Sequence, residues 1–474
     1  MTRKAAFLAG LFVLCMGVLL LQIVETRVLS VISYYHLAFF AISMAMFGMT
    51  AGALIAYFNQ ARLAPEHLLG HLAWITSAFT LGVVLSTVVL ISTVVLDTSA
   101  GILLSAVLWL KLIAALVPPY VFAGMGISLA LTRSPWRIGR VYGCGLAGAA
   151  AGCLGALVLL NLVDGVSALF AIAALGAAAA LLFRHGAQPV ERTAAAPPPW
   201  TLLGRPGGLF VGLAIFTLVN AAIAPNGLAL TFAKSGVLSG NLAATLTLAI
   251  IIALSTVLVV LTIVLPALPA ARRLPARLIA SGTCYFLLIG LGFMLVEIGV
   301  IQRLSIFLGH PVYGLALGLF GIIVATGAGS LLSDRLPLTA PARALTRSAL
   351  IVPYLVLLPL WLPAAMQAFE ANGIAVRAAL ALAAIAPAGV LMGFGFSTGM
   401  RLVTALDPRP TPWFGAINGA AGVLVAGLAV AISIAFSIDA CIWLGAACYL
   451  PLGAAGRALM RAGSPAAAER PAYA

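Results

Sequence analysis

Long apolar segments follow one another along almost the whole chain, and they restrict its fold more than any other feature. A transmembrane helix needs roughly 20 mostly apolar residues. Segments of suitable length lie near residues 5–24, 37–58, 73–96, 101–131, 141–162, 166–183, 209–224, 242–265, 278–301, 312–332, 348–368, 378–400, 413–436 and 440–456. Only 8% of the residues are charged, against about a quarter in a soluble domain. Because backbone in lipid must satisfy its own hydrogen bonds, this pattern predicts an all-α, multi-pass membrane protein with about fourteen transmembrane helices.

The basic residues predict how these helices are oriented. The net charge is +14, and the basic residues fall mostly in short loops rather than in one patch, which indicates a membrane partner and no nucleic acid. If fourteen segments span and the N-terminus is cytoplasmic, most Lys and Arg residues lie inside, as the positive-inside tendency requires. Segment 209–224 is the shortest, and its length also fits a helix on the membrane surface. Without it, "ARRLPAR" at 271–277 would lie outside.

An internal repeat divides the chain. "PPYVFAGMGIS" (118–128) matches "PAGVLMGFGFS" (387–397), and "YGCGLAG" (142–148) resembles "WFGAING" (413–419), in each case about 270 residues apart. We expect the shared prolines and glycines to act as hinge or packing positions, because small residues let helix backbones approach closely. These positions are Pro118, Gly124, Gly126, Pro387, Gly393 and Gly395.

The repeat predicts two parallel six-helix halves, which is the plan of the major facilitator superfamily, with two extra helices between them. The expected parts are an N-terminal bundle at 1–184, a cytoplasmic linker plus two helices at 185–277, and a C-terminal bundle with a disordered tail at 278–474. The basic start resembles a secretory signal but lacks a small-x-small cleavage site, so we interpret it as a retained first helix. Fold alone does not assign function.

Two stretches carry a family resemblance. "GLGFMLVEIGVIQRLSIFLGHPVYGLALGLFGIIVATGAGSLLSDR" (290–335) and "TPWFGAINGAAGVLVAG" (411–427) resemble the membrane part of bacterial fused spermidine synthases. The resemblance implies a facilitator-like bundle in the bacterial inner membrane. That family joins the bundle to a soluble aminopropyltransferase-like domain, whereas here no Gly-rich nucleotide turn follows a strand. We therefore expect no enzymatic activity, no catalytic residues and no cofactor, and a separate cytoplasmic enzyme stands as a candidate partner.

Charged side chains inside apolar segments are costly, so each one suggests a function. Glu25 and Glu297 lie late in the first helix of their halves, and Lys111 lies about 15 Å into the fourth helix. Gln22, one turn before Glu25, aligns with Glu297 when the two Leu-Ser pairs are superposed. We expect these residues to line a central cavity and to bind a solute, a cation or a proton. The alternatives are that Glu297 forms a structural pair with Arg303 or Lys111, and that Glu25 reaches the membrane interface.

Two more polar residues complete the expected solute or ion site. Arg303 precedes Leu304 and Ser305, and His310 begins the second helix of the C-terminal half, where a histidine either senses pH or forms an ordinary polar interface. The six cysteines lie in apolar runs without Cys-x-x-Cys spacing, so we expect neither a metal site nor disulfides.

These features favour one class of function over two others. A duplicated bundle with buried charges indicates a secondary transporter of a small solute, with a charged or polyamine-like solute as the expected class. A non-catalytic membrane scaffold or regulatory subunit related to fused spermidine synthases is the alternative. A lipid-modifying enzyme is disfavoured, because neither a nucleophile with its base nor a set of metal ligands is recognisable.

Overall fold

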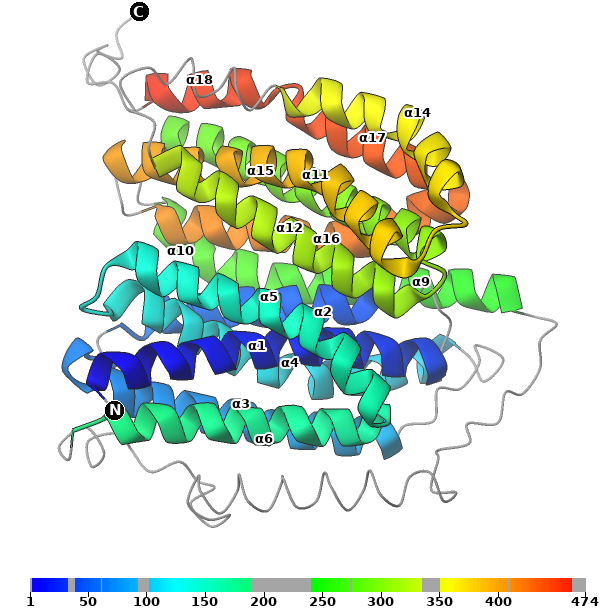
Figure 1. Ribbon diagram of the computed structural model, residues 1–474. Coiled ribbons are helices and arrows are strands. Elements are labelled where there is room, and N and C mark those ends of the chain that lie inside the picture. Colours follow the sequence, from blue (N-terminus) through cyan, green and yellow to red (C-terminus); the bar gives the residue numbers. More distant parts are fainter. Residues whose placement is uncertain are drawn as a thin grey trace, which may run out of the picture. The chain divides into compact units, whose positions relative to one another are not determined.

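The computed structural model describes residues 2–32, 39–60, 62–92, 102–188, 240–272, 275–334, 350–406 and 410–462. These residues form helices and no strand (Figure 1). Thirteen helices in this part of the chain are long and apolar enough to cross a membrane. They correspond one to one to thirteen of the expected segments, whereas segment 209–224 lies outside the described residues. The all-helical, multi-pass prediction is confirmed.

The chain divides into two compact units, Met1–Val257 and Leu258–Ala474. The main helices of the first unit are α1 (Arg3–Ile32), α2 (Phe39–Phe58), α3 (Leu68–Ser92), α4 (Ile102–Arg133), α5 (Ile138–Leu162) and α6 (Gly165–Gly186). The short 3-10 helix η2 (Pro65–His67) precedes α3. A longer helical stretch crosses the boundary between the units and consists of α9 (Gly240–Val259), the π-helix η6 (Val260–Val264) and α10 (Leu265–Arg272).

The second unit repeats this plan. Its helices are α11 (Ala276–Phe307), α12 (Pro311–Asp334), α14 (Ile351–Phe369), α15 (Ile374–Leu406), α16 (Thr411–Ala435), α17 (Ile438–Tyr449) and α18 (Leu452–Ala462). In the first unit α1 packs against α5 and α6, α2 against α4, and α3 against α4 and α6. In the second unit α11 packs against α16 and α17, α12 against α15, and α14 against α15 and α17. The two halves therefore share one packing pattern.

Glycines at matching positions explain the closest of these contacts. In the first unit, a Cβ atom on Gly124 of α4 would collide with the backbone carbonyl of Met49 on α2. In the second unit, a Cβ atom on Gly393 of α15 would collide with the carbonyl of Thr326 on α12. Only glycine lets the backbones meet at these points, which is how membrane helices commonly pack. The repeat noticed in the sequence is thus a repeat of helix contacts.

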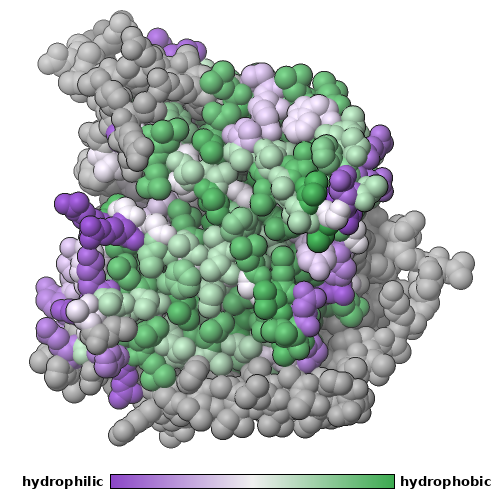
Figure 2. All heavy atoms as spheres, in the orientation of Figure 1, coloured by the Kyte–Doolittle hydropathy of each residue, from purple (hydrophilic) through white to green (hydrophobic). Residues whose placement is uncertain are grey.

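Hydrophobic side chains also cover the outside of the helices. In the face shown in Figure 2, they occupy the middle of the helices, and hydrophilic side chains gather near the helix ends. Exposed apolar residues include Val158 and Leu162 on α5 and Leu360 on α14. In water this arrangement would be unfavourable, whereas in a bilayer these surfaces face acyl chains.

Candidate functional site

The most completely buried charged side chain of the first unit is that of Glu25 on α1, which has 0% relative exposure. Its two carboxyl oxygens accept hydrogen bonds from different helices. The hydroxyl of Ser86 on α3 donates to Oε1 at 3.0 Å, and the hydroxyl of Tyr120 on α4 donates to Oε2 at 2.7 Å. Glu25 therefore links three helices of the N-terminal half, and it does not lie at the surface as the alternative interpretation expected.

Gln22 lies one turn before Glu25 on the same face of α1 and is also buried. Its backbone carbonyl accepts a hydrogen bond from the hydroxyl of Thr26 at 2.6 Å. The polar face of α1 thus runs over at least one full turn, from Gln22 to Thr26. A buried face of this kind inside a membrane helix is expensive unless its groups are paired, and the Glu25 carboxyl is paired with two hydroxyls.

Lys111 has a different environment from the carboxylates. It is exposed on α4, on a helix face that also carries the exposed apolar residues Val107 and Leu110. In the described part of the chain no ion pair joins Lys111 to an acidic residue. The structure therefore does not bring Lys111 together with Glu25 as one pair within the N-terminal half.

Glu297 is the buried carboxyl of the second unit. It lies on α11 with 6% relative exposure, between the fully buried Met294 and Ile301. Among the described residues it has neither a hydrogen-bond partner nor an ion-pair partner. A carboxyl at this depth without a protein partner is unusual, because burial of an unpaired ionisable group is costly.

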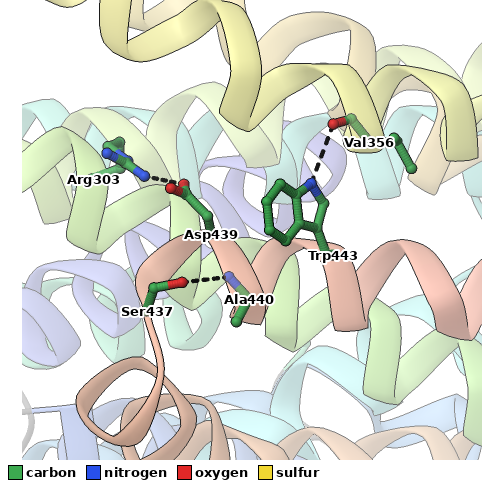
Figure 3. A network of polar contacts seen from close by, with 6 residues as sticks. All are labelled: Arg303, Val356, Ser437, Asp439, Ala440 and Trp443. Atoms are coloured by element: carbon green, nitrogen blue, oxygen red, sulfur yellow. Dashed lines mark hydrogen bonds and ion pairs between the residues drawn. The ribbon is translucent and has the colours of Figure 1, made fainter.

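Arg303 does not pair with Glu297. Its guanidinium forms an ion pair with Asp439 in the first turn of α17, and the two side chains are 20% and 29% exposed (Figure 3). The hydroxyl of Ser437 caps the same turn by accepting a hydrogen bond from the backbone N–H of Ala440 at 3.0 Å. Arg303 is therefore a brace between α11 and α17, and the sequence-based pairing of Glu297 with Arg303 is not formed.

A second contact extends this brace to α14. The indole Nε1–H of Trp443, one turn after Asp439 on α17, donates to the backbone carbonyl of Val356 at 3.2 Å (Figure 3). Three helices of the C-terminal half are thus connected by polar contacts near the beginning of α17. This arrangement favours a structural role for Arg303 over a role in solute binding.

His310 lies at the start of α12, just before Pro311. Its Nδ1 accepts a hydrogen bond from the backbone N–H of Val312 at 3.2 Å, and its ring packs edge-on against Tyr313 with centroids 5.6 Å apart. This contact satisfies one of the free N–H groups at the helix start. Its described contacts are therefore those of a capping residue.

The remaining positions lie in the two matching helices. Pro118 and Pro387 lie inside α4 and α15. Gly126 faces Ile75 of α3, and the carbonyl of Gly395 accepts a hydrogen bond from the hydroxyl of Tyr285 at 2.8 Å. Within the described residues, no group of three or more His, Cys, Asp or Glu side chains is arranged to hold a metal ion.

Three important polar residues were missed by sequence reasoning, namely Ser86, Tyr120 and Asp439. Tyr120 lies within the repeated segment 118–128, and its counterpart in the second half is Gly389. That difference within a repeat was a usable signal of a specific role. Ser86 and Asp439 carried no comparable signal, because a single serine inside a span and an aspartate at a helix start are both common.

No protein-family model matches the chain, and no curated protein matches it. Solved structures do match. A glutamate-to-glutamine variant of the peptide transporter POT in complex with sulfate aligns over 96% of this chain and 94% of its own, with a TM-score of 0.53 and 13% identity. This chain has a major-facilitator-like fold.

Other structures of POT agree with this assignment. The same variant without sulfate covers 98% of this chain and 99% of its own at a TM-score of 0.53 and 12% identity. The variant in complex with alafosfalin covers 96% and 95% at a TM-score of 0.52 and 14% identity. Identities this low establish the fold and leave the substrate open.

Proposed function

We propose that this protein is a secondary transporter of a small solute in the bacterial inner membrane, with a charged or polyamine-like solute as its class. The observation that carries this proposal is Glu297, a carboxyl inside a membrane helix with no partner among the described residues. Carboxyl groups at membrane depth commonly belong to substrate or ion pathways. A cationic solute or a proton would supply the partner that the protein lacks.

The fold supports a carrier in the same direction. Two six-helix halves with one packing pattern are the arrangement in which alternating access takes place by movement of one half against the other. POT, which shares this fold, is described as a peptide transporter. The resemblance of residues 290–335 to fused spermidine synthases adds an expectation of amine chemistry, and a separate cytoplasmic enzyme as a partner belongs to this proposal.

Glu25 and Glu297 have different roles in this proposal. Both oxygens of Glu25 are occupied by hydroxyl donors, so Glu25 fixes the helices of its half. Glu297 has no such donors in the described part of the chain, and it is therefore the carboxyl that is available to a ligand. Lys111 is the cation on an exposed face of α4, where it would meet an anionic group of the solute or lipid headgroups.

Uptake into proteoliposomes tests the proposal. The purified chain is reconstituted, and uptake of labelled amines, amino acids and peptides is measured with and without an imposed proton gradient and membrane potential. Glu297→Gln is expected to abolish uptake while leaving folding intact. Glu370→Gln, which changes an exposed glutamate at the end of α14, serves as the matched control.

The result also separates a transporter from a scaffold. If the wild-type chain moves none of these solutes, and Glu297→Gln merely lowers thermal stability, the scaffold interpretation replaces the transporter. Co-purification of a soluble enzyme from native membranes would then support the regulatory-subunit reading.

A further inference from the structure

A second polar group lies close to the face of α11 that carries Glu297. Oδ1 of Asn418, on α16, is buried and has no hydrogen-bond partner in the described part of the chain. It lies 3.1 Å from the position that a Cβ atom on Gly290 of α11 would occupy. The absence of a side chain at Gly290 is thus what lets the carboxamide of Asn418 reach α11.

The helix geometry places Glu297 in line with this contact. Glu297 follows Gly290 by two turns of α11, which puts it on the same face, roughly 10 Å further along the axis at about 1.5 Å per residue. The buried apolar side chain of Met294 lies between them. The opposite face of α11 is occupied by α17, where Gly299 lies against Ile442.

The neighbour of α11 changes at the level of Glu297. Below it, Gly290 meets α16 through Asn418, and one turn above it, Ile301 meets α12 at Gly318. Glu297 therefore lies where one helix contact ends and the next begins. Such a position explains why its carboxyl is nearly buried and still has no described protein partner.

We propose that Asn418 recognises the second end of the solute whose first end is bound by Glu297, and that the solute is a linear alkyl diammonium ion. This inference rests on the proposed transport function and adds the substrate class to it. An ammonium group suits the Glu297 carboxylate, and a second N–H donor suits Oδ1 of Asn418. The apolar stretch at Met294 suits the alkyl chain between them. A monoamine fills only one of the two acceptors.

Binding measurements test the two-ended site without requiring transport. The full chain is purified into lipid nanodiscs, and the affinities of spermidine, putrescine and the monoamine butylamine are measured by calorimetry. Spermidine, the longest of the three, is expected to bind about tenfold or more tightly than butylamine, because a hydrogen bond between charged and neutral partners contributes about that much.

Variants at Asn418 determine whether this residue is responsible. Asn418→Leu is expected to lower the spermidine affinity to that of butylamine and to leave butylamine binding unchanged. Asn418→Asp adds a charge and is expected to tighten spermidine binding further, so it provides a test even if the leucine variant fails to fold. Asn372→Leu, at an exposed asparagine just after α14, is the control and should change neither affinity.

The outcomes distinguish this inference from the transporter proposal. Equal affinities for spermidine and butylamine in the wild-type chain, no amine binding at all, or a preference that survives Asn418→Leu would each overturn the two-ended site. If the preference depends on Asn418 but proteoliposomes take up no solute, the transport proposal fails and the binding site stands. If other solutes are transported without a diamine preference, only the present inference fails.

Discussion

Replacement of Tyr120 by phenylalanine tests the polar link between the helices of the N-terminal half. The substitution removes the hydroxyl that donates to Glu25 at 2.7 Å and keeps the ring. Both side chains have 0% exposure, so water does not replace the lost donor. Leaving a buried acceptor unsatisfied costs about 1–3 kcal/mol, and the charge-accepting character of a carboxyl places the expected loss near the middle, about 2 kcal/mol.

Unfolding equilibria in mixed micelles, with denaturing detergent as the variable, measure this loss. Tyr57→Phe, at a half-buried tyrosine near the end of α2, is the control and should stay within about 0.5 kcal/mol of wild type. Ser86→Ala removes the second donor to Glu25, at 3.0 Å. Since both donors serve one carboxyl, the double variant should depart from additivity by about 0.5 kcal/mol or more. A Tyr120→Phe variant as stable as Tyr57→Phe would refute the reasoning.

Three further outcomes are expected. Gly124→Ala should destabilise the chain by about 1–3 kcal/mol, because its Cβ atom would collide with α2, whereas Gly139→Ala, in open space on α5, should be neutral or slightly stabilising in the same unfolding assay. Asp439→Asn should cost at most about 1 kcal/mol, since its ion pair with Arg303 is partly exposed, and the loss should shrink as salt is raised; a loss independent of salt would contradict this assignment. Lys111→Leu should leave thermal stability unchanged and reduce solute uptake, and a water-soluble amine reagent applied to native membranes should modify Lys111; uptake equal to wild type would remove it from the solute pathway.

The charged residues show how far sequence reasoning reached into the site. Glu25 and Glu297 were recognised as unusual because carboxyl groups rarely occur within spans, and the structure places both in the protein interior. Their partners were not recognisable. Tyr120 lies 95 residues from Glu25 along the chain, and Asp439 lies 136 residues from Arg303. Pairing at such separations depends on how each helix is rotated, and no local pattern specifies that rotation.

The sequence by itself determined that the chain spans a membrane many times as helices, because segments so apolar can satisfy their backbone in lipid only that way. It also revealed the duplication, since glycines that allow close backbone contact recur at matching positions of α4 and α15. Only the tertiary structure decided which faces point inward. Lipid and protein interior are similarly apolar, so hydrophobicity does not separate them, and the inward face is selected by close contacts such as Gly124 with Met49 and by polar links such as Glu25 with Tyr120.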